Sequence, residues 1–151
     1  MDKCNKVAAL YIATLKAMAL IHQHSHWTTK GQMFYGDHLL FMRIYESAQE
    51  NLDTAAEKFM GVLGDEVLDY DLQNELMGKV LEKYSKLEGS PLQMSLAIEK
   101  EFLGFSKAAY DSFESEGKMT LGLDDMIMAI SSQREESVYL LQQTLKGTDH
   151  E

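Results

Sequence analysis

A stretch of about thirty residues, from about Phe34 to about Leu63, repeats apolar side chains every three or four positions and contains no proline. This spacing predicts one long α-helix with a single apolar stripe. The stripe consists of Phe41, Ile44, Tyr45, Ala48, Leu52, Ala55, Phe59, Val62 and Leu63. Most of the stability of such a helix comes from packing its apolar face against other elements. The stretch therefore predicts the core of a helical bundle.

A second stripe on the same predicted helix carries residue types that bind metals. It consists of His38, Met42, Glu46, Gln49, Asp53, Glu57 and Met60. One interpretation is a solvated face. The other is a metal site, because Asp53 and Glu57 are four positions apart and lie one turn apart on one face. Carboxylate oxygens together with imidazole nitrogens suit Fe(II), Mn(II) or Zn(II).

The spacing of the histidines and carboxylates bears on where such a site can form. His26 lies near the end of a predicted first helix, and His38 lies near the start of the second. Asp53 follows His38 by fifteen residues, which is about 22 Å of helix. Metal–ligand bonds are about 2 Å, so one copy of the helix cannot place both residues around one ion. Two copies packed antiparallel about a two-fold axis can, and they would form two equal sites.

A different kind of site, a di-iron centre inside one four-helix bundle, uses Glu-x-x-His on two helices. The residues three positions before the five histidines are Ala19, Ile21, Gln23, Tyr35 and Gly147. None is acidic, so that kind of centre is not expected here.

The chain resembles the Dps family of mini-ferritins. The resemblance rests on the spacing of His26-Trp27, Lys30-Gly31, Phe34, His38, Tyr45, Asp53 and Ala56-Glu57. It implies an all-α, ferritin-like four-helix bundle, two-fold dimers assembled into a hollow dodecamer, and oxidation of Fe(II) to stored Fe(III) with H2O2 as the oxidant.

The same resemblance assigns roles to residues. The ligands that match His26 and His38 come from one subunit, and those that match Asp53 and Glu57 come from its neighbour. Trp27 would shield the metal site. Zn2+ is another divalent cation that this ligand set could take.

One position at the metal site departs from the family pattern. The family has an Asp one turn after the second histidine, where this chain has Met42, so a reduced ferroxidase activity is one open interpretation. Glu46, one turn further on, could supply a carboxylate instead. His22 shares a face with His26 and is a further candidate ligand, although a polar packing role is favoured for it.

Acidic residues near the turn before the last helix fall at positions that line an iron-entry pore in the Dps family. Glu116 and Asp125 fall at pore-lining positions of the family, and the third acidic position falls on Leu121. Asp124 or Glu114 could compensate. The alternative for each of these acids is an ordinary solvated surface charge.

The remaining segments predict three further helices and a long crossover. Asp2 is a plausible N-cap for a helix to about Thr28, and Lys30-Gly31 is a turn. The connection from residue 65 to residue 89 is long enough to carry a short helix. Ser90, Pro91 and Gln93 predict the start of a third helix that runs to about Glu116. A fourth should begin near residues 120–123 and end before Gly147.

Length and charge limit the remaining possibilities. The 151 residues, with 45% apolar, suit one domain over residues 1–151. The net charge of −10, the absence of a basic N-terminal tail and the net acidic residues 146–151 argue against binding to DNA or to a membrane surface. No unbroken run approaches eighteen apolar residues, and the lone Cys4 favours a reducing cytoplasm.

Three functions compete on these observations. The first is a ferroxidase cage that binds and stores iron and protects against oxidative damage. The second is the same cage with an impaired ferroxidase site, acting as a passive metal store or a structural shell, which Met42 keeps open. The third, a plain helical interaction module, does not explain the spacing of histidines and carboxylates.

Overall fold

The computed structural model describes residues 1–148, and within them the secondary structure is entirely helical. The elements are α1 (Lys3–Thr28), α2 (Phe34–Leu63), the short 3-10 helix η1 (Asp65–Leu68), α3 (Tyr70–Ser85), α4 (Pro91–Ser115) and α5 (Leu121–Thr148). The predicted all-α class is confirmed. The first two helices begin or end within a residue or two of the positions that the hydrophobic spacing predicts.

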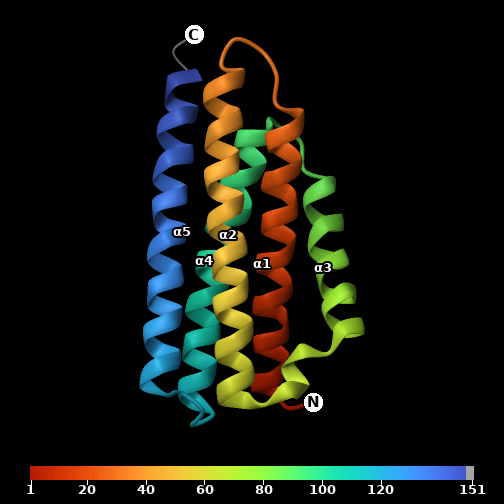
Figure 1. Ribbon diagram of the computed structural model, residues 1–151, viewed down its shortest axis with the longest axis vertical. Helices are drawn as coiled ribbons and strands as arrows, with labels where there is room; N and C mark the ends of the chain where they lie inside the picture. Colours follow the sequence, from red (N-terminus) through yellow and green to blue (C-terminus); the bar gives the residue numbers. More distant parts are fainter. Residues whose placement is uncertain (149–151) are drawn as a thin grey trace.

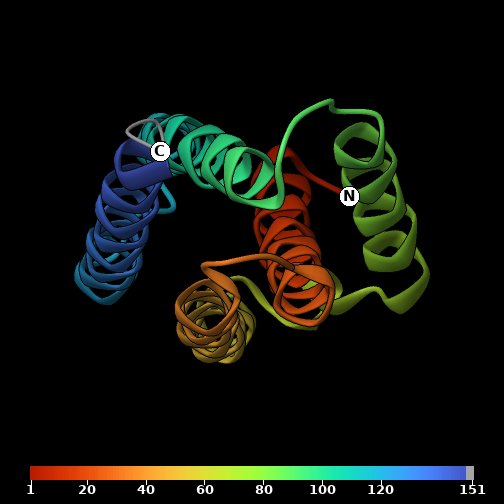
Figure 2. The ribbon, with the colours of Figure 1, turned by 90° about the horizontal axis from the view of Figure 1, so that it is seen from above.

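The four long helices form a bundle with one long crossover. α1 runs away from the N-terminus, and α2 returns beside it (Figure 1). η1 and α3 then carry the chain back along the bundle, so that α4 runs parallel to α2 and α5 runs antiparallel to α4. Seen along the bundle, α3 lies outside the four-helix core, on the side of α1 away from α5 (Figure 2). The predicted ferritin-like connection between the second and third long helices is confirmed.

Short-range capping bonds set two of the helix boundaries, and a glycine turn follows a third. The Asp2 carboxylate accepts the Asn5 N–H at 2.8 Å at the start of α1. At the start of α4 the Gln93 N–H donates to the Ser90 hydroxyl at 3.2 Å, and the Ser90 N–H donates to the Gln93 side chain at 2.8 Å. This reciprocal pair is the predicted capping box. In the turn after α1, Gly31 has φ +101°, a conformation that glycine adopts without strain.

The predicted end of the last helix is wrong by two residues. α5 continues through Gly147 to Thr148. A glycine inside a helix costs only about 1 kcal/mol relative to alanine, so the intact hydrogen-bond ladder outweighs it. Asp149, His150 and Glu151, whose acidic charge forms part of the argument against DNA binding, lie outside the described residues.

α1 is the central helix of the molecule. It packs against α2, α3 and α4, and its buried residues therefore cover more than one face. The Tyr11 ring meets the ring of Phe59 edge-on at a centroid distance of 5.3 Å and that of Phe102 at 5.1 Å. Edge-to-face contacts of this kind add to the stabilisation from burial.

The central position of α1 explains its hydropathy. By length and composition alone, Lys3–Thr28 could cross a membrane. Within the fold, 67% of its most apolar window is buried against other helices. A core helix of a bundle has the same composition for that reason, so the hydropathy is only a weak indication of a membrane span.

Candidate functional site

The two stripes predicted on α2 face different surroundings. The first stripe supplies core residues, and five of its members are buried: Phe41, Ile44, Ala48, Ala55 and Phe59. Along the second stripe His38 and Met42 are half-buried, whereas Glu46, Asp53 and Glu57 are exposed. The candidate carboxylates therefore lie on the surface of the single chain, where a dissolved cation can reach them.

His26 and His38 bind each other's backbone across the turn between α1 and α2. The Nδ1 atom of His26 lies 2.7 Å from the carbonyl oxygen of His38, and Nδ1 of His38 lies 2.7 Å from the carbonyl oxygen of His26. A carbonyl oxygen only accepts, so each Nδ1 carries the proton. The neutral ring then has its lone pair on Nε2, and no hydrogen bond to either Nε2 occurs among the described residues. This is the arrangement in which a protein holds a histidine for a metal.

A row of rings holds these imidazoles in place. The rings of His26 and His38 are stacked with a centroid distance of 3.7 Å and an interplanar angle of 15°. Phe34 stacks on the other face of this pair, 5.0 Å from His38, and Tyr45 meets His26 edge-on at 5.4 Å. Rings packed in this way have little freedom to rotate, so both imidazoles are preorganised.

Trp27, the residue predicted to shield the site, is 64% exposed in the isolated chain. It lines a groove with Leu20 and Leu87, which are each 45% exposed. Large apolar side chains gathered on a surface mark a place where another molecule packs. Within one subunit Trp27 covers no metal site, so its shielding role stays a prediction for the assembled protein.

The single chain does not bring the predicted ligands together. Within residues 1–148, no group of three or more His, Cys, Asp or Glu side chains is arranged to hold a metal ion. His26 and His38 meet at the turn between α1 and α2, whereas Asp53 lies fifteen residues further along the same straight helix. The two parts of the predicted ligand set are thus presented separately.

His22 belongs to a different, fully buried cluster in the middle of the bundle. Its Nδ1 lies 3.0 Å from the Ser95 hydroxyl, and its Nε2 lies 3.0 Å from Oε1 of Glu99. Arg134 donates to the same Glu99 oxygen at 3.1 Å and to the Ser47 hydroxyl at 2.6 Å. Each of the four long helices contributes at least one of these side chains. Burial lowers the pKa of Arg134, and the neighbouring Glu99 carboxylate counteracts that effect.

This buried cluster bears on the two roles considered for His22. Both ring nitrogens already have partners, which favours the polar packing role over metal ligation. The sequence interpretation missed Glu99 and Arg134. A signal was present, because Arg134 stands four residues after Ile130 and four before Val138 on the inner face of α5, where a charge needs a buried partner.

The predicted pore residues lie together at the opposite end of the bundle from the paired histidines. Glu116 caps the C-terminus of α4 and lies 3.9 Å from the Lys3 ammonium group. Asp124, in the first turn of α5, accepts a hydrogen bond from the Tyr110 hydroxyl at 3.2 Å. Asp125 is exposed, and Leu121, at the third family position, is 91% exposed. The pore itself would form only between subunits and stays a prediction.

The fold is similar to that of a solved structure. The structure of Dps from Thermosynechococcus elongatus superposes with a TM-score of 0.79 over 95% of this chain and 90% of that one, at 17% sequence identity. The chain has the Dps-type, ferritin-like fold. At this level of identity the likeness to Dps shows the fold alone. No protein-family model matches the chain, and no curated protein sequence does.

Proposed function

We propose that this protein is a Dps-like mini-ferritin that oxidises Fe(II) and stores Fe(III). The observation that carries the proposal is the reciprocal pair of Nδ1–H···O=C bonds between His26 and His38. These bonds keep both rings in the tautomer whose Nε2 can bind a divalent cation. Asp53 and Glu57 on the exposed face of α2 supply the oxygen ligands.

The iron site is shared between two subunits. About 22 Å of helix separates His38 from Asp53, so the carboxylates of each site come from the neighbouring chain in a two-fold dimer. Exposed Trp27 and its apolar groove are then covered in the assembly. By likeness to the Dps fold, six such dimers form a hollow dodecamer in the cytoplasm.

The chemistry needs two electrons for each peroxide. Two Fe(II) ions each give one electron, and H2O2 with two protons becomes two molecules of water. His26 and His38 hold the entering Fe(II) as neutral nitrogen ligands. Asp53 and Glu57 balance the higher charge of Fe(III), which carboxylates bind more strongly than imidazoles do. The net charge of −10 favours accumulation of cations and opposes binding to DNA.

Mixing two inactive variants tests the shared site. His26→Ala and Asp53→Ala assemblies should each lose most Fe(II) binding. If the site is shared, a mixed dimer regains one intact site of its two, because the wild-type histidines of one chain face the wild-type carboxylates of the other. Random co-assembly should then restore roughly one quarter of the sites. Correctly sized mixed assemblies that recover no iron binding would show that the ligands do not come from two chains.

Met42 supports a second candidate function, a cage with an impaired ferroxidase site. Met42 is half-buried one turn after His38, and thioether sulfur is a soft, neutral ligand that suits Fe(II) and Fe(III) poorly. Met42→Asp should raise the iron bound per subunit and the initial rate of oxidation by peroxide, and Met42→Leu should change neither. If Met42→Asp assembles normally and leaves both quantities unchanged, Met42 does not limit the site, and Glu46 already supplies the carboxylate.

A further inference from the structure

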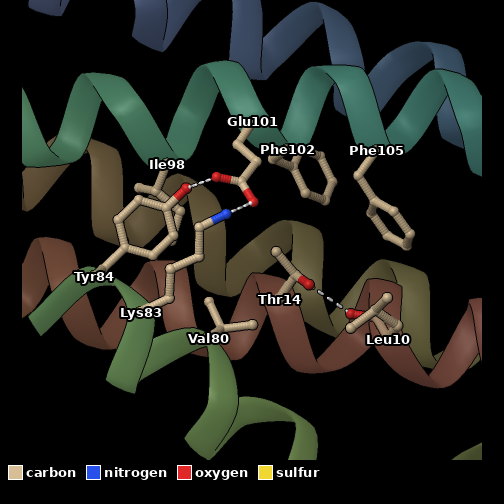
Figure 3. A pocket seen from close by; sticks show the side chains of 9 residues that line it. All are labelled: Leu10, Thr14, Val80, Lys83, Tyr84, Ile98, Glu101, Phe102 and Phe105. Atoms are coloured by element: carbon tan, nitrogen blue, oxygen red, sulfur yellow. Dashed lines mark hydrogen bonds and ion pairs between the residues drawn. The ribbon is translucent and has the colours of Figure 1, made fainter. Parts of the chain in front are cut away.

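A small cavity of about 140 Å3 lies between α1, α3 and α4, and none of its lining residues is a histidine (Figure 3). Its walls are mostly apolar. Leu10 comes from α1, Val80 from α3, and Ile98, Phe102 and Phe105 from α4. The cavity exists because α3 packs along α1 but makes few backbone contacts with α4. The side chains between α3 and α4 therefore leave space that no residue of the described chain fills.

The polar groups around this cavity already have partners. The Glu101 carboxylate accepts a hydrogen bond from the Lys83 ammonium group at 2.5 Å and another from the Tyr84 hydroxyl. The Thr14 hydroxyl donates to the carbonyl oxygen of Leu10 at 2.7 Å. Figure 3 shows these bonds among the side chains that line the cavity. A buried water needs two to four polar partners, and the apolar part of the wall, formed by Leu10, Val80, Ile98, Phe102 and Phe105, offers none.

The hydrogen bonds to Glu101 also close the cavity on one side. They are the side-chain hydrogen bonds that join α3 to α4 within residues 1–148. The Lys83 and Glu101 side chains are 58% and 51% exposed, so this side faces solvent. Separation of the Lys83–Glu101 ion pair costs little at such exposure. A small molecule can therefore enter between α3 and α4 without disruption of the four-helix core.

We propose that this cavity is a binding site for one small, uncharged, apolar molecule of about the size of benzene. An apolar cavity of about 150 Å3 in another protein stays dry and binds benzene or xenon. This cavity has nearly the same volume, and most of its wall is apolar, with Lys83, Tyr84 and Glu101 along the side that faces solvent. The bound molecule contacts Phe102 on one side and Val80 on the other, and it braces α3 against the bundle. The site is independent of the iron chemistry.

Two measurements on the full-length, assembled protein test the site. A crystal under xenon pressure should show one anomalous peak between Val80 and Phe102. Benzene at about five times its dissociation constant should raise the Tm by roughly 2–4 °C, because a ligand that binds only the folded state stabilises it. Absence of both the xenon peak and the benzene shift would overturn the proposal.

A substitution that fills the cavity gives the matched control. Val80→Phe should lower the affinity for benzene at least tenfold and remove the xenon peak. Val138→Phe enlarges a half-buried valine on α5 that does not line the cavity. It should leave the benzene affinity and the xenon peak unchanged. Val80→Phe protein that binds benzene as tightly as the wild type would place the ligand elsewhere and refute the site. If Val80→Phe does not fold, the wild-type crystal is the test: a xenon peak between Val80 and Phe102 supports the site, and its absence refutes it.

Discussion

His22 and His26 lie one turn apart on α1, yet their imidazole rings have opposite surroundings. Both nitrogens of His22 have hydrogen-bond partners, and the side chain is fully buried. His26 uses Nδ1 for the backbone of His38, and no bond to its Nε2 occurs among the described residues. The comparison shows that a shared helix face does not make a shared site. A histidine is available to a metal only when the fold leaves one nitrogen without a partner.

The two clusters also differ in what they contribute to the protein. Around His22, the Glu99 and Arg134 charges are fully buried, and at least one bonded side chain from each long helix constrains how the four helices align. Removal of Glu99 or of Arg134 leaves the other charge unpaired in the core. Around His26 the rings lie at the end of the bundle, beside the turn between α1 and α2, and no charged side chain is paired with them among the described residues. We therefore expect the first cluster to govern stability and the second to govern metal binding.

The largest expected effect is on stability at Arg134. Arg134→Met should lower the free energy of unfolding by about 3–5 kcal/mol, because Glu99 is left as an uncompensated buried charge. Arg43→Met is the matched control. Arg43 pairs with Glu136, but their side chains are 64% and 54% exposed, so its loss should cost no more than about 1 kcal/mol. Urea unfolding measures both. Equal losses in the two variants would contradict the special role of the buried cluster.

The next largest effect is on Zn(II) binding, and it distinguishes His26 from His22. His26→Ala should weaken Zn(II) binding by at least about tenfold, or 1.4 kcal/mol, and should lower the free energy of unfolding by about 1 kcal/mol, for one hydrogen bond and the ring contacts. His22→Ala should leave Zn(II) affinity unchanged but cost about 1–3 kcal/mol of stability, because its buried partners lose hydrogen bonds. Calorimetric titration and urea unfolding of both assembled variants give the comparison. The reverse pattern would show that His22 is the ligand.

A smaller effect tests the ring row beside the metal ligands. Phe34→Leu removes the ring that stacks on His38 at 5.0 Å, an interaction worth about 0.5–1.5 kcal/mol. We expect Zn(II) affinity to fall about two- to tenfold, since His38 becomes less well oriented. Tyr35→Leu, at a neighbouring 71% exposed ring, is the control and should bind like the wild type. Unchanged affinity in both variants would show that stacking does not orient His38.

The smallest effect comes from a carboxylate outside both clusters. Burial alone would raise the pKa of Glu101, but the hydrogen bonds from Lys83 and Tyr84 and the Lys83 charge lower it overall. A carboxyl group whose pKa is lower in the folded than in the unfolded protein stabilises the folded state. This stabilisation is fully present above the pKa of the unfolded chain, about 4.3, and is lost as the pH falls through the folded pKa.

Because Glu101 and Lys83 are half-exposed, this contribution should stay below about 1 kcal/mol. The stability difference between wild type and Glu101→Gln should shrink as the pH is lowered from 7 to 3. Urea unfolding of both proteins across that range measures the difference. A difference that is the same at all pH values would show that the Glu101 charge adds nothing.

The sequence by itself determined the helices, because their signals are local. The spacing of apolar residues over 34–63 and the capping residues Asp2 and Ser90 act within a few positions of each boundary. The long crossover likewise follows from its length and apolar spacing. The one boundary error, at Gly147, is a case in which the hydrogen bonds of a continuing helix outweigh a weak local preference.

Only the tertiary structure decided which polar residues could act at a site. The pairing of His22 with Glu99 joins residues 77 positions apart, and Arg134 reaches Glu99 from another helix. No local pattern reports which ring nitrogens such contacts occupy. The same holds for His26 and His38, whose spacing marked them as candidates but whose free Nε2 atoms follow from how the turn between α1 and α2 packs. Helical periodicity places a side chain on a face, whereas hydrogen bonds across the fold determine whether its lone pair is left for a metal.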